Sequence, residues 1–75
     1  MKKDILEIYL NKNVIILLSD YTIHSGVLYK VKDYAKRDIS LKGFKNYYFV
    51  ENKTDFSKNR TLFRSSGVKE IKINI

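Results

Sequence analysis

The hydrophobic pattern begins with a short helical segment. Over residues 3–11, apolar side chains recur at helical spacing, with Ile5, Ile8 and Tyr9 on one face at positions i, i+3 and i+4. Asp4 can cap this segment or complement the helix dipole. Because a helix of two turns is not stable alone in water, we expect it to pack against the rest of the domain.

From residue 14 onward the pattern is typical of β-strands. Residues 14–18 form an uninterrupted apolar run of strand length, rich in β-branched side chains, which ends at Ser19-Asp20. The next segment, residues 22–31, alternates between apolar and polar positions. Further strands are predicted, in chain order, at residues 39–41, 47–50, 61–64 and 68–75.

The strand at residues 22–31 has the clearest alternation. Gly26 lies inside it, and a glycine within a strand marks a sharp bend or a close approach of another backbone. One face of this strand holds Ile23, Val27, Tyr29 and Val31, and the other holds Thr22, His24 and Lys30. In the last strand, Ile71, Ile73 and Ile75 are predicted to share a face.

One helix followed by about five short, strongly bent strands predicts a mainly β fold, namely a small SH3-like barrel with a short N-terminal helix. A chain of 75 residues is sufficient for one domain. We therefore expect a single domain over residues 1–75. It would comprise the helix at 3–11 and a barrel over 14–75, with a polar loop at 51–60.

Composition narrows the classes of function. The formal net charge is +7, which favours a polyanionic partner such as a nucleic acid. The chain has no cysteine and one histidine, which excludes disulfides and zinc sites built from Cys and His. The acidic residues lie in or beside predicted turns, and neither a catalytic triad nor a phosphate-binding glycine loop is present. We expect a protein that is not an enzyme and has no cofactor.

The N-terminal residues do not resemble a targeting segment. The apolar positions of MKKDILEIYL are interrupted by Asp4 and Glu7, unlike those of a signal peptide. No stretch approaches the roughly 20 apolar residues of a membrane-spanning helix. The expectation is a cytoplasmic protein without a membrane partner.

The order of the predicted helix and strands, together with two sequence motifs, resembles that of the Sm-like (Sm/LSm/Hfq) family. Asp20 is followed by Gly26 six residues later and by Leu28 eight residues later, as in the first family motif. Asp33-Tyr34 stands at the start of the segment where the family has a loop of the form Asp-x-aromatic-x-Asn. The segment FRSSGV, residues 63–68, occupies the second motif, which is apolar-Arg-Gly-x-x-apolar. The resemblance extends from Ile5 to Ile73 and implies an Sm-like barrel.

The chain departs from the family pattern at four places, and one of them is a first loop that is about two residues longer. Tyr21 stands where the family has the glycine of Asp-Gly, and Ser65 replaces the glycine after Arg64. Asp38 or Arg37 occupies the position of the base-reading asparagine.

In the family, an RNA base is held between the loop aromatic and the arginine of the second motif. The resemblance therefore implies that Tyr34 stacks on a base and that Arg64 lies over the base or binds a phosphate. Asp38 would take the hydrogen-bonding role, and as a carboxylate it can only accept. The predicted nucleic-acid-binding residues are Tyr34, Lys36, Arg37, Asp38, Arg64 and Ser65. Lys42, Lys45 and Tyr47 form a second, weaker basic and aromatic group.

Three functions remain open from the sequence. The first is an RNA-binding Sm-like protein that forms a homo-oligomeric ring through the strands at 61–64 and 69–75 and binds single-stranded RNA. The second is a monomeric SH3-like barrel that binds a protein partner, as an adaptor or an inhibitor of phage or plasmid type. The third is a small DNA-binding barrel, whose affinity would fall steeply with salt.

Overall fold

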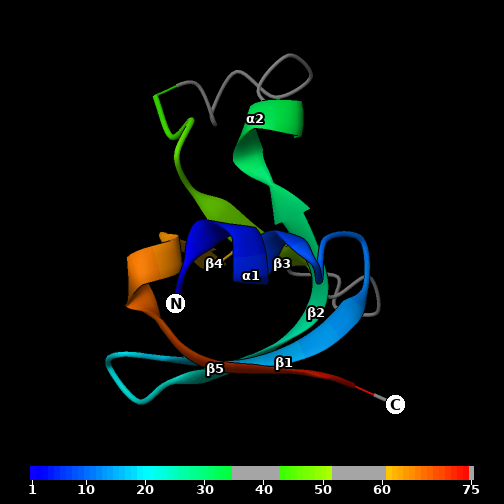
Figure 1. Cartoon of the computed structure of the whole chain (residues 1–75), viewed down its shortest axis with the longest axis vertical. Helices are drawn as coiled ribbons and strands as arrows, with labels where there is room; N and C mark the ends of the chain where they lie inside the picture. Colours follow the sequence, from blue (N-terminus) through cyan, green and yellow to red (C-terminus); the bar gives the residue numbers. More distant parts are fainter. Residues whose placement is uncertain (35–42, 52–60, 75) are drawn as a thin grey trace.

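The computed structural model describes residues 1–34, 43–51 and 61–74. Within these ranges the chain is mainly β, with a short helix at its N-terminus, so the predicted fold class is confirmed (Figure 1). The elements are α1 (Lys3–Glu7), β1 (Asn13–Leu18), β2 (Ile23–Lys30), α2 (Val31–Tyr34), β3 (Tyr48–Glu51), β4 (Thr61–Phe63), the 3-10 helix η2 (Ser65–Gly67) and β5 (Val68–Ile73).

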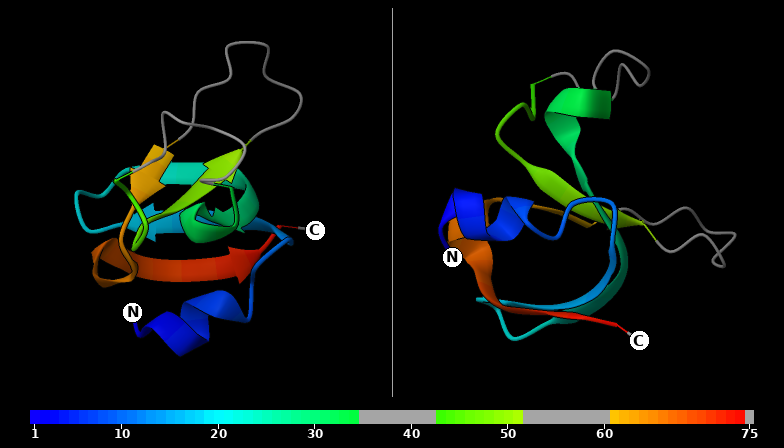
Figure 2. Two further views of the ribbon diagram at one scale, coloured as in Figure 1. Left: turned by 90° about the horizontal axis from the view of Figure 1, so that it is seen from above. Right: turned by 45° about the vertical axis from the view of Figure 1, so that its right-hand side comes forward.

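The strands form one curled antiparallel sheet. Among the described residues, its five strands lie in the order β4-β3-β2-β1-β5, so β4 and β5 are the two edges of this part of the sheet. The first half of β2, from Ile23 to Val27, pairs with β1, whereas its second half, from Val27 to Lys30, pairs with β3. This change of partner within one strand gives the sheet its strong curvature (Figures 1 and 2).

Gly26 lies at the bend of β2. It is buried, directly opposite Val14, and one residue before the position where β2 changes its partner from β1 to β3. Its φ of 147° is in a region that side-chain-bearing residues rarely adopt. The sequence left open a sharp bend or a close backbone approach at this glycine, and its φ and the change of strand partner beside it favour the bend.

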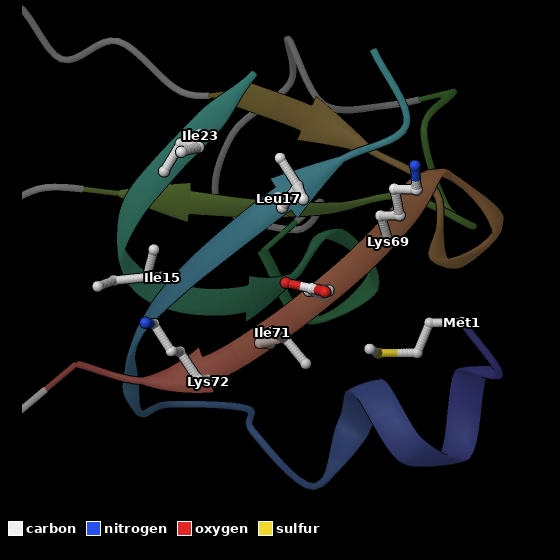
Figure 3. A pocket seen from close by; sticks show the side chains of 8 residues that line it. Met1, Ile15, Leu17, Ile23, Lys69, Ile71 and Lys72 are labelled. Carbon is white, nitrogen blue, oxygen red and sulfur yellow. The ribbon is translucent and has the colours of Figure 1, made fainter. Parts of the chain in front are cut away.

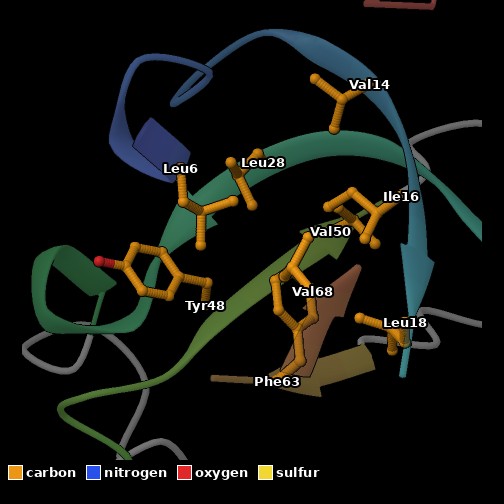
Figure 4. Close-up of a cluster of buried hydrophobic side chains, with 9 residues drawn as sticks. All are labelled: Leu6, Val14, Ile16, Leu18, Leu28, Tyr48, Val50, Phe63 and Val68. Atoms are coloured by element: carbon orange, nitrogen blue, oxygen red, sulfur yellow. The ribbon is translucent and has the colours of Figure 1, made fainter. Parts of the chain in front are cut away.

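The main hydrophobic core fills the inside of the curl (Figure 4). A second, smaller cluster lies on the opposite side of the sheet, where Tyr29, Val31 and Phe49 are buried and Val27, Tyr47 and Leu62 pack against them. Complete burial of one large apolar side chain stabilises the fold by roughly 1.5–3 kcal/mol. The buried members of the main core are Leu6, Val14, Ile16, Leu18, Leu28, Tyr48, Val50, Phe63 and Val68.

The N-terminal helix is shorter than predicted and packs through a different face. The α-helix covers only Lys3–Glu7, and the amides of residues 8–10 and 12 each donate to the carbonyl three residues earlier, whereas the Asn11 amide donates to the Leu28 carbonyl. Leu6 is fully buried and Tyr9 and Leu10 pack against the core, whereas Ile5 and Ile8 are exposed. The predicted Ile5–Ile8–Tyr9 face was therefore wrong. The segment has two overlapping apolar faces with the same i, i+3, i+4 spacing, and periodicity does not distinguish between them.

The faces predicted for the strands β2 and β5 agree with the structure only in part. Val27 and Tyr29 pack on one face of β2 as predicted, but Ile23 is exposed and Val31 begins α2. In β5, Ile71 packs against the main core and Ile73 is partly exposed. Three assignments lie outside the described residues: the strand at 39–41, positions 52–60 of the polar loop, and Ile75.

A polar contact joins α1 to the sheet beside the core. Lys30 of β2 forms a hydrogen-bonded ion pair with Glu7, which holds the pKa of Glu7 below its ordinary value. The Tyr48 side chain lies in the core, and its hydroxyl has no hydrogen-bond partner of normal geometry among the described residues. Burial and, secondarily, the charge of the Glu7 carboxylate raise the pKa of Tyr48 to about 12.

We expect Tyr48→Phe to leave the free energy of unfolding unchanged at neutral pH or to raise it by about 1 kcal/mol, because it removes a buried hydroxyl without a partner. The raised pKa of Tyr48 also leads us to expect that the folded protein loses stability in alkali. The unfolded tyrosine ionises near pH 10 and the folded one near pH 12. The stability is therefore complete below pH 10, and about 2–3 kcal/mol is lost as pH rises to 12.

Urea unfolding from pH 8 to 12 tests both expectations. The difference in free energy of unfolding between wild type and Tyr48→Phe isolates the contribution of this one group, because the lysines and the other tyrosines titrate in both proteins. A difference that stays constant over that pH range would contradict the assignment.

Candidate nucleic-acid interface

Arg64 lies on the surface between β4 and η2. Its backbone is extended, with φ −98° and ψ 157°, and its side chain is exposed. Two backbone hydrogen bonds fix the turn that follows: the Gly67 amide donates to the Arg64 carbonyl over 2.9 Å, and the Ser19 amide donates to the Gly67 carbonyl over 2.8 Å. The Arg64 backbone is thus held next to the β1–β2 turn.

The Arg64 guanidinium carbon lies 5.7 Å from the centre of the Tyr47 ring. This is within the range of a cation–π contact. Tyr47 in turn contacts Phe44 edge-on, with ring centres 5.2 Å apart and an angle of 89° between the ring planes. We call Phe44, Tyr47 and Arg64 the Arg64 cluster.

The backbone fixes the aromatic part of the Arg64 cluster. The Tyr47 amide donates to the Phe44 carbonyl over 2.9 Å, and the Tyr47 carbonyl accepts from Val31, the first residue of α2, over 3.1 Å. Tyr47 is half-buried against the second hydrophobic cluster, while Phe44 and the neighbouring Lys45 are exposed. The β2–β3 and β4–β5 connections therefore meet at this cluster, which offers two aromatic rings and one guanidinium.

The six predicted binding residues are only partly described. Arg64 and Ser65 lie together at the start of η2, where the Ser65 carbonyl accepts a hydrogen bond from the Met1 amino group over 3.1 Å. Tyr34 is the last residue of α2, and its side chain is not described. The remaining three predicted residues, Lys36, Arg37 and Asp38, lie outside the described ranges.

Sequence analysis did not identify Tyr47 and Phe44 as neighbours of Arg64. The available signal was the basic and aromatic composition around Lys45 and Tyr47, which gives no information about a contact with a residue 17 positions further along. The β3–β4 register explains the contact, because Tyr48 pairs with Phe63 in antiparallel strands. Tyr47 comes directly before Tyr48 and Arg64 directly after Phe63, so both lie at the same end of these strands.

The β1–β2 turn forms even though Tyr21 replaces a glycine. Asp20 accepts hydrogen bonds from the Thr22 hydroxyl at 2.5 Å and the Thr22 amide at 3.0 Å, which hold the pKa of Asp20 below its ordinary value. Tyr21 adopts φ 65°. Lys69 of β5 donates to the Tyr21 hydroxyl over 2.8 Å and lies 4.1 Å from its ring centre. This departure from the family motif is therefore compatible with a tight turn.

His24 has a structural role in the described region. Its Nε2 is 2.9 Å from the Thr22 hydroxyl and its Nδ1 is 3.3 Å from the Thr61 hydroxyl, so it links β2 to β4. The described ranges contain no group of three or more His, Cys, Asp or Glu side chains that could hold a metal ion.

Among the helices of residues 1–34, 43–51 and 61–74, none combines the length and the apolar character needed to cross a membrane. Comparison of the chain with protein-family models, curated proteins and solved structures gave no match.

Proposed function

We propose that this protein is an RNA-binding, Sm-like protein that forms a homo-oligomeric ring and binds single-stranded RNA at the Arg64 cluster. The observation that carries the proposal is the position of Arg64 over Tyr47, where the β2–β3 and β4–β5 connections meet. In the Sm-like family, these two connections supply the aromatic residue and the arginine that hold a base. The predicted loop residues Tyr34, Lys36, Arg37 and Asp38 belong to the same β2–β3 connection.

The chemistry of the Arg64 cluster suits unpaired bases. A base can stack on an aromatic ring or on the planar guanidinium, and such stacking contributes roughly 1–3 kcal/mol per base. Phe44 is exposed beside Tyr47 and enlarges the aromatic surface. The net charge of +7 attracts the phosphates and accelerates association with RNA at low salt.

The sheet order supports ring formation. Its outer strands, β4 and β5, each have a single strand partner within the described part of the chain. An unpaired strand edge presents backbone donors and acceptors that a neighbouring strand can satisfy. Pairing of β4 from one copy with β5 of the next is head-to-tail, and head-to-tail contacts close into a ring where the rotation allows.

Single substitutions at the Arg64 cluster test the RNA site. We expect Arg64→Ala and Tyr47→Ala each to weaken binding of a single-stranded RNA by roughly tenfold, equivalent to about 1.4 kcal/mol. Tyr47→Phe should bind almost as wild type, because it keeps the ring. Fluorescence anisotropy with labelled RNA at one fixed salt concentration measures these affinities.

Lys12→Ala is the matched control, since Lys12 is an exposed cation outside the cluster. It should lower affinity only slightly, through the loss of one charge. Wild-type affinity in Arg64→Ala and Tyr47→Ala would contradict the proposed site. Competition by duplex DNA as strong as by single-stranded RNA would favour the DNA-binding alternative instead.

The ring is tested separately by the solution mass of nuclease-treated protein. A discrete closed multimer is expected from light scattering behind size exclusion. A monomer at all concentrations would contradict the ring and favour the monomeric SH3-like barrel with a protein partner.

A further inference from the structure

A groove of about 480 Å³ lies on the outer surface of the sheet, and its lining includes no residue of the Arg64 cluster (Figure 3). Isoleucine and leucine side chains of β1, β2 and β5 line it, and Ile23 is 69% exposed. We call this feature the outer groove. Its lining residues are Met1, Ile15, Leu17, Ile23, Lys69, Glu70, Ile71 and Lys72.

A second exposed apolar surface lies on α1. Ile5 is 47% exposed and Ile8 is 63% exposed, while Leu6 of the same helix packs into the core. Helical spacing places Asp4 on the face of Ile5 and Ile8, since Asp4 precedes Ile8 by four residues. This face of α1, formed by Asp4, Ile5 and Ile8, is the α1 face.

The outer groove and the α1 face adjoin each other on one molecule. Met1 lines the groove and is separated by Lys2 from α1, which runs beside β5 (Figure 3). Together they make an apolar surface of the kind that marks an interaction site in a small protein. Because both halves belong to the same chain, two copies related by a twofold axis can cover both of them at once.

The charges of the two surfaces are complementary. The outer groove carries lysines at 69 and 72, and the α1 face carries the Asp4 carboxylate. Lys69 is already bound to Tyr21, so Lys72 is the lysine available to pair with Asp4. Glu70 in the groove disfavours an anionic membrane or a phosphate backbone as the occupant.

We propose that the outer groove binds the α1 face of a second copy of this chain, and that the contact is reciprocal. Ile5 and Ile8 of one copy pack on the floor formed by Ile15, Leu17 and Ile23 of the other. This contact uses neither the Arg64 cluster nor the edge-to-edge pairing of β4 with β5. It therefore does not depend on RNA binding or on a ring, and within a ring it would join two rings face to face.

Cross-linking tests the contact directly, because the native chain contains no cysteine. An Ile8→Cys variant is mixed with an isotope-labelled Ile23→Cys variant and treated with a short thiol-specific cross-linker. The expected product is a mixed covalent dimer, identified by its mass. Phe44→Cys, which places an exposed cysteine in the Arg64 cluster, replaces Ile23→Cys as the matched control and should give little product. Equal yields in the two mixtures would overturn the proposal.

Solution association gives the second test. Ile8→Lys and Ile23→Lys should each weaken the contact by at least about tenfold in sedimentation experiments. Circular dichroism confirms that each variant is folded, and the milder Ile23→Ser replaces Ile23→Lys if it is not. Association lost in Ile23→Lys but kept in Ile8→Lys would overturn α1 as the occupant, and association kept in both would overturn the groove as the contact.

A charge exchange tests the pairing within the contact. Asp4→Lys should weaken association, and Lys72→Asp in the same chain should restore it. An Asp4→Lys variant that associates like wild type, or a double variant that associates no better than Asp4→Lys, would overturn the Asp4–Lys72 pair. The whole proposal is overturned if the Ile8→Cys and Ile23→Cys variants give no mixed cross-link and the wild-type protein stays monomeric into the hundreds of micromolar, whatever the outcome of the RNA experiments.

Discussion

Leu6→Ala is expected to lower the free energy of unfolding by about 2–5 kcal/mol, the cost of removing a large apolar side chain from a fully packed core. Leu6 has no exposed surface and is the buried side chain of α1. A helix of five residues has almost no stability of its own, so its position depends on this anchor. Its loss would also release the Glu7–Lys30 ion pair and expose the end of the core that α1 covers.

Urea unfolding at low protein concentration measures this effect while keeping any association between copies small. The matched control is Ile8→Ala, which removes an exposed apolar side chain from the same segment. It should change the free energy of unfolding by no more than about 0.5 kcal/mol. If Leu6→Ala were as stable as Ile8→Ala, the helix would not be anchored in the core as described.

These two residues also show the limit of sequence analysis for α1. The alternation of apolar and polar positions located the helix and most of the described strands, because burial on one side of a strand or helix imposes a period. It did not identify which face of the helix is buried, because the segment has two overlapping apolar faces. The choice of Leu6 over Ile5 and Ile8 depends on tertiary packing with η2 and with the other side chains of the main core, which a local pattern does not contain.

At the candidate site, too, the sequence located a residue but not its tertiary contacts. The second motif located Arg64, since an arginine directly after a strand and before a turn is visible in the sequence. Tyr47 was identified only as part of a weaker basic and aromatic group, and its contact with Arg64 was not predicted because that contact follows from the β3–β4 register. The outer groove was also missed: the apolar run at residues 14–18 predicted a strand, but not that Ile15 and Leu17 would be left without a covering layer.

The special position of Gly26 in its strand, by contrast, was recognised from the sequence. Its replacement is the second substitution expected to have a large effect on the free energy of unfolding. We expect Gly26→Ala to lower the free energy of unfolding by about 1–3 kcal/mol through backbone strain, because a φ of 147° is unfavourable for alanine. The position is buried, so the added methyl group should cost roughly another 1–3 kcal/mol in a closely packed interior.

Gly67→Ala is the matched control for this substitution. Gly67 does not have a positive φ, and a methyl group there would meet no atom within 4 Å. Its replacement should leave stability unchanged or raise it by about 0.4–1 kcal/mol, by restricting the unfolded chain. Gly43→Ala separates strain from crowding, since Gly43 has φ 106° but open space around it. A stable Gly26→Ala protein would mean that β2 bends by another route.

The consequence for function follows from the position of Gly26 in β2. The bend directs the first half of β2 toward β1 and β5 and the second half toward β3 and β4. If the bend relaxes, the two edge strands change their relative orientation, and Arg64 moves with β4. Where the Gly26→Ala protein remains partly folded, we therefore expect ring assembly and RNA affinity to fall together, whereas Arg64→Ala should reduce RNA affinity and leave the mass unchanged.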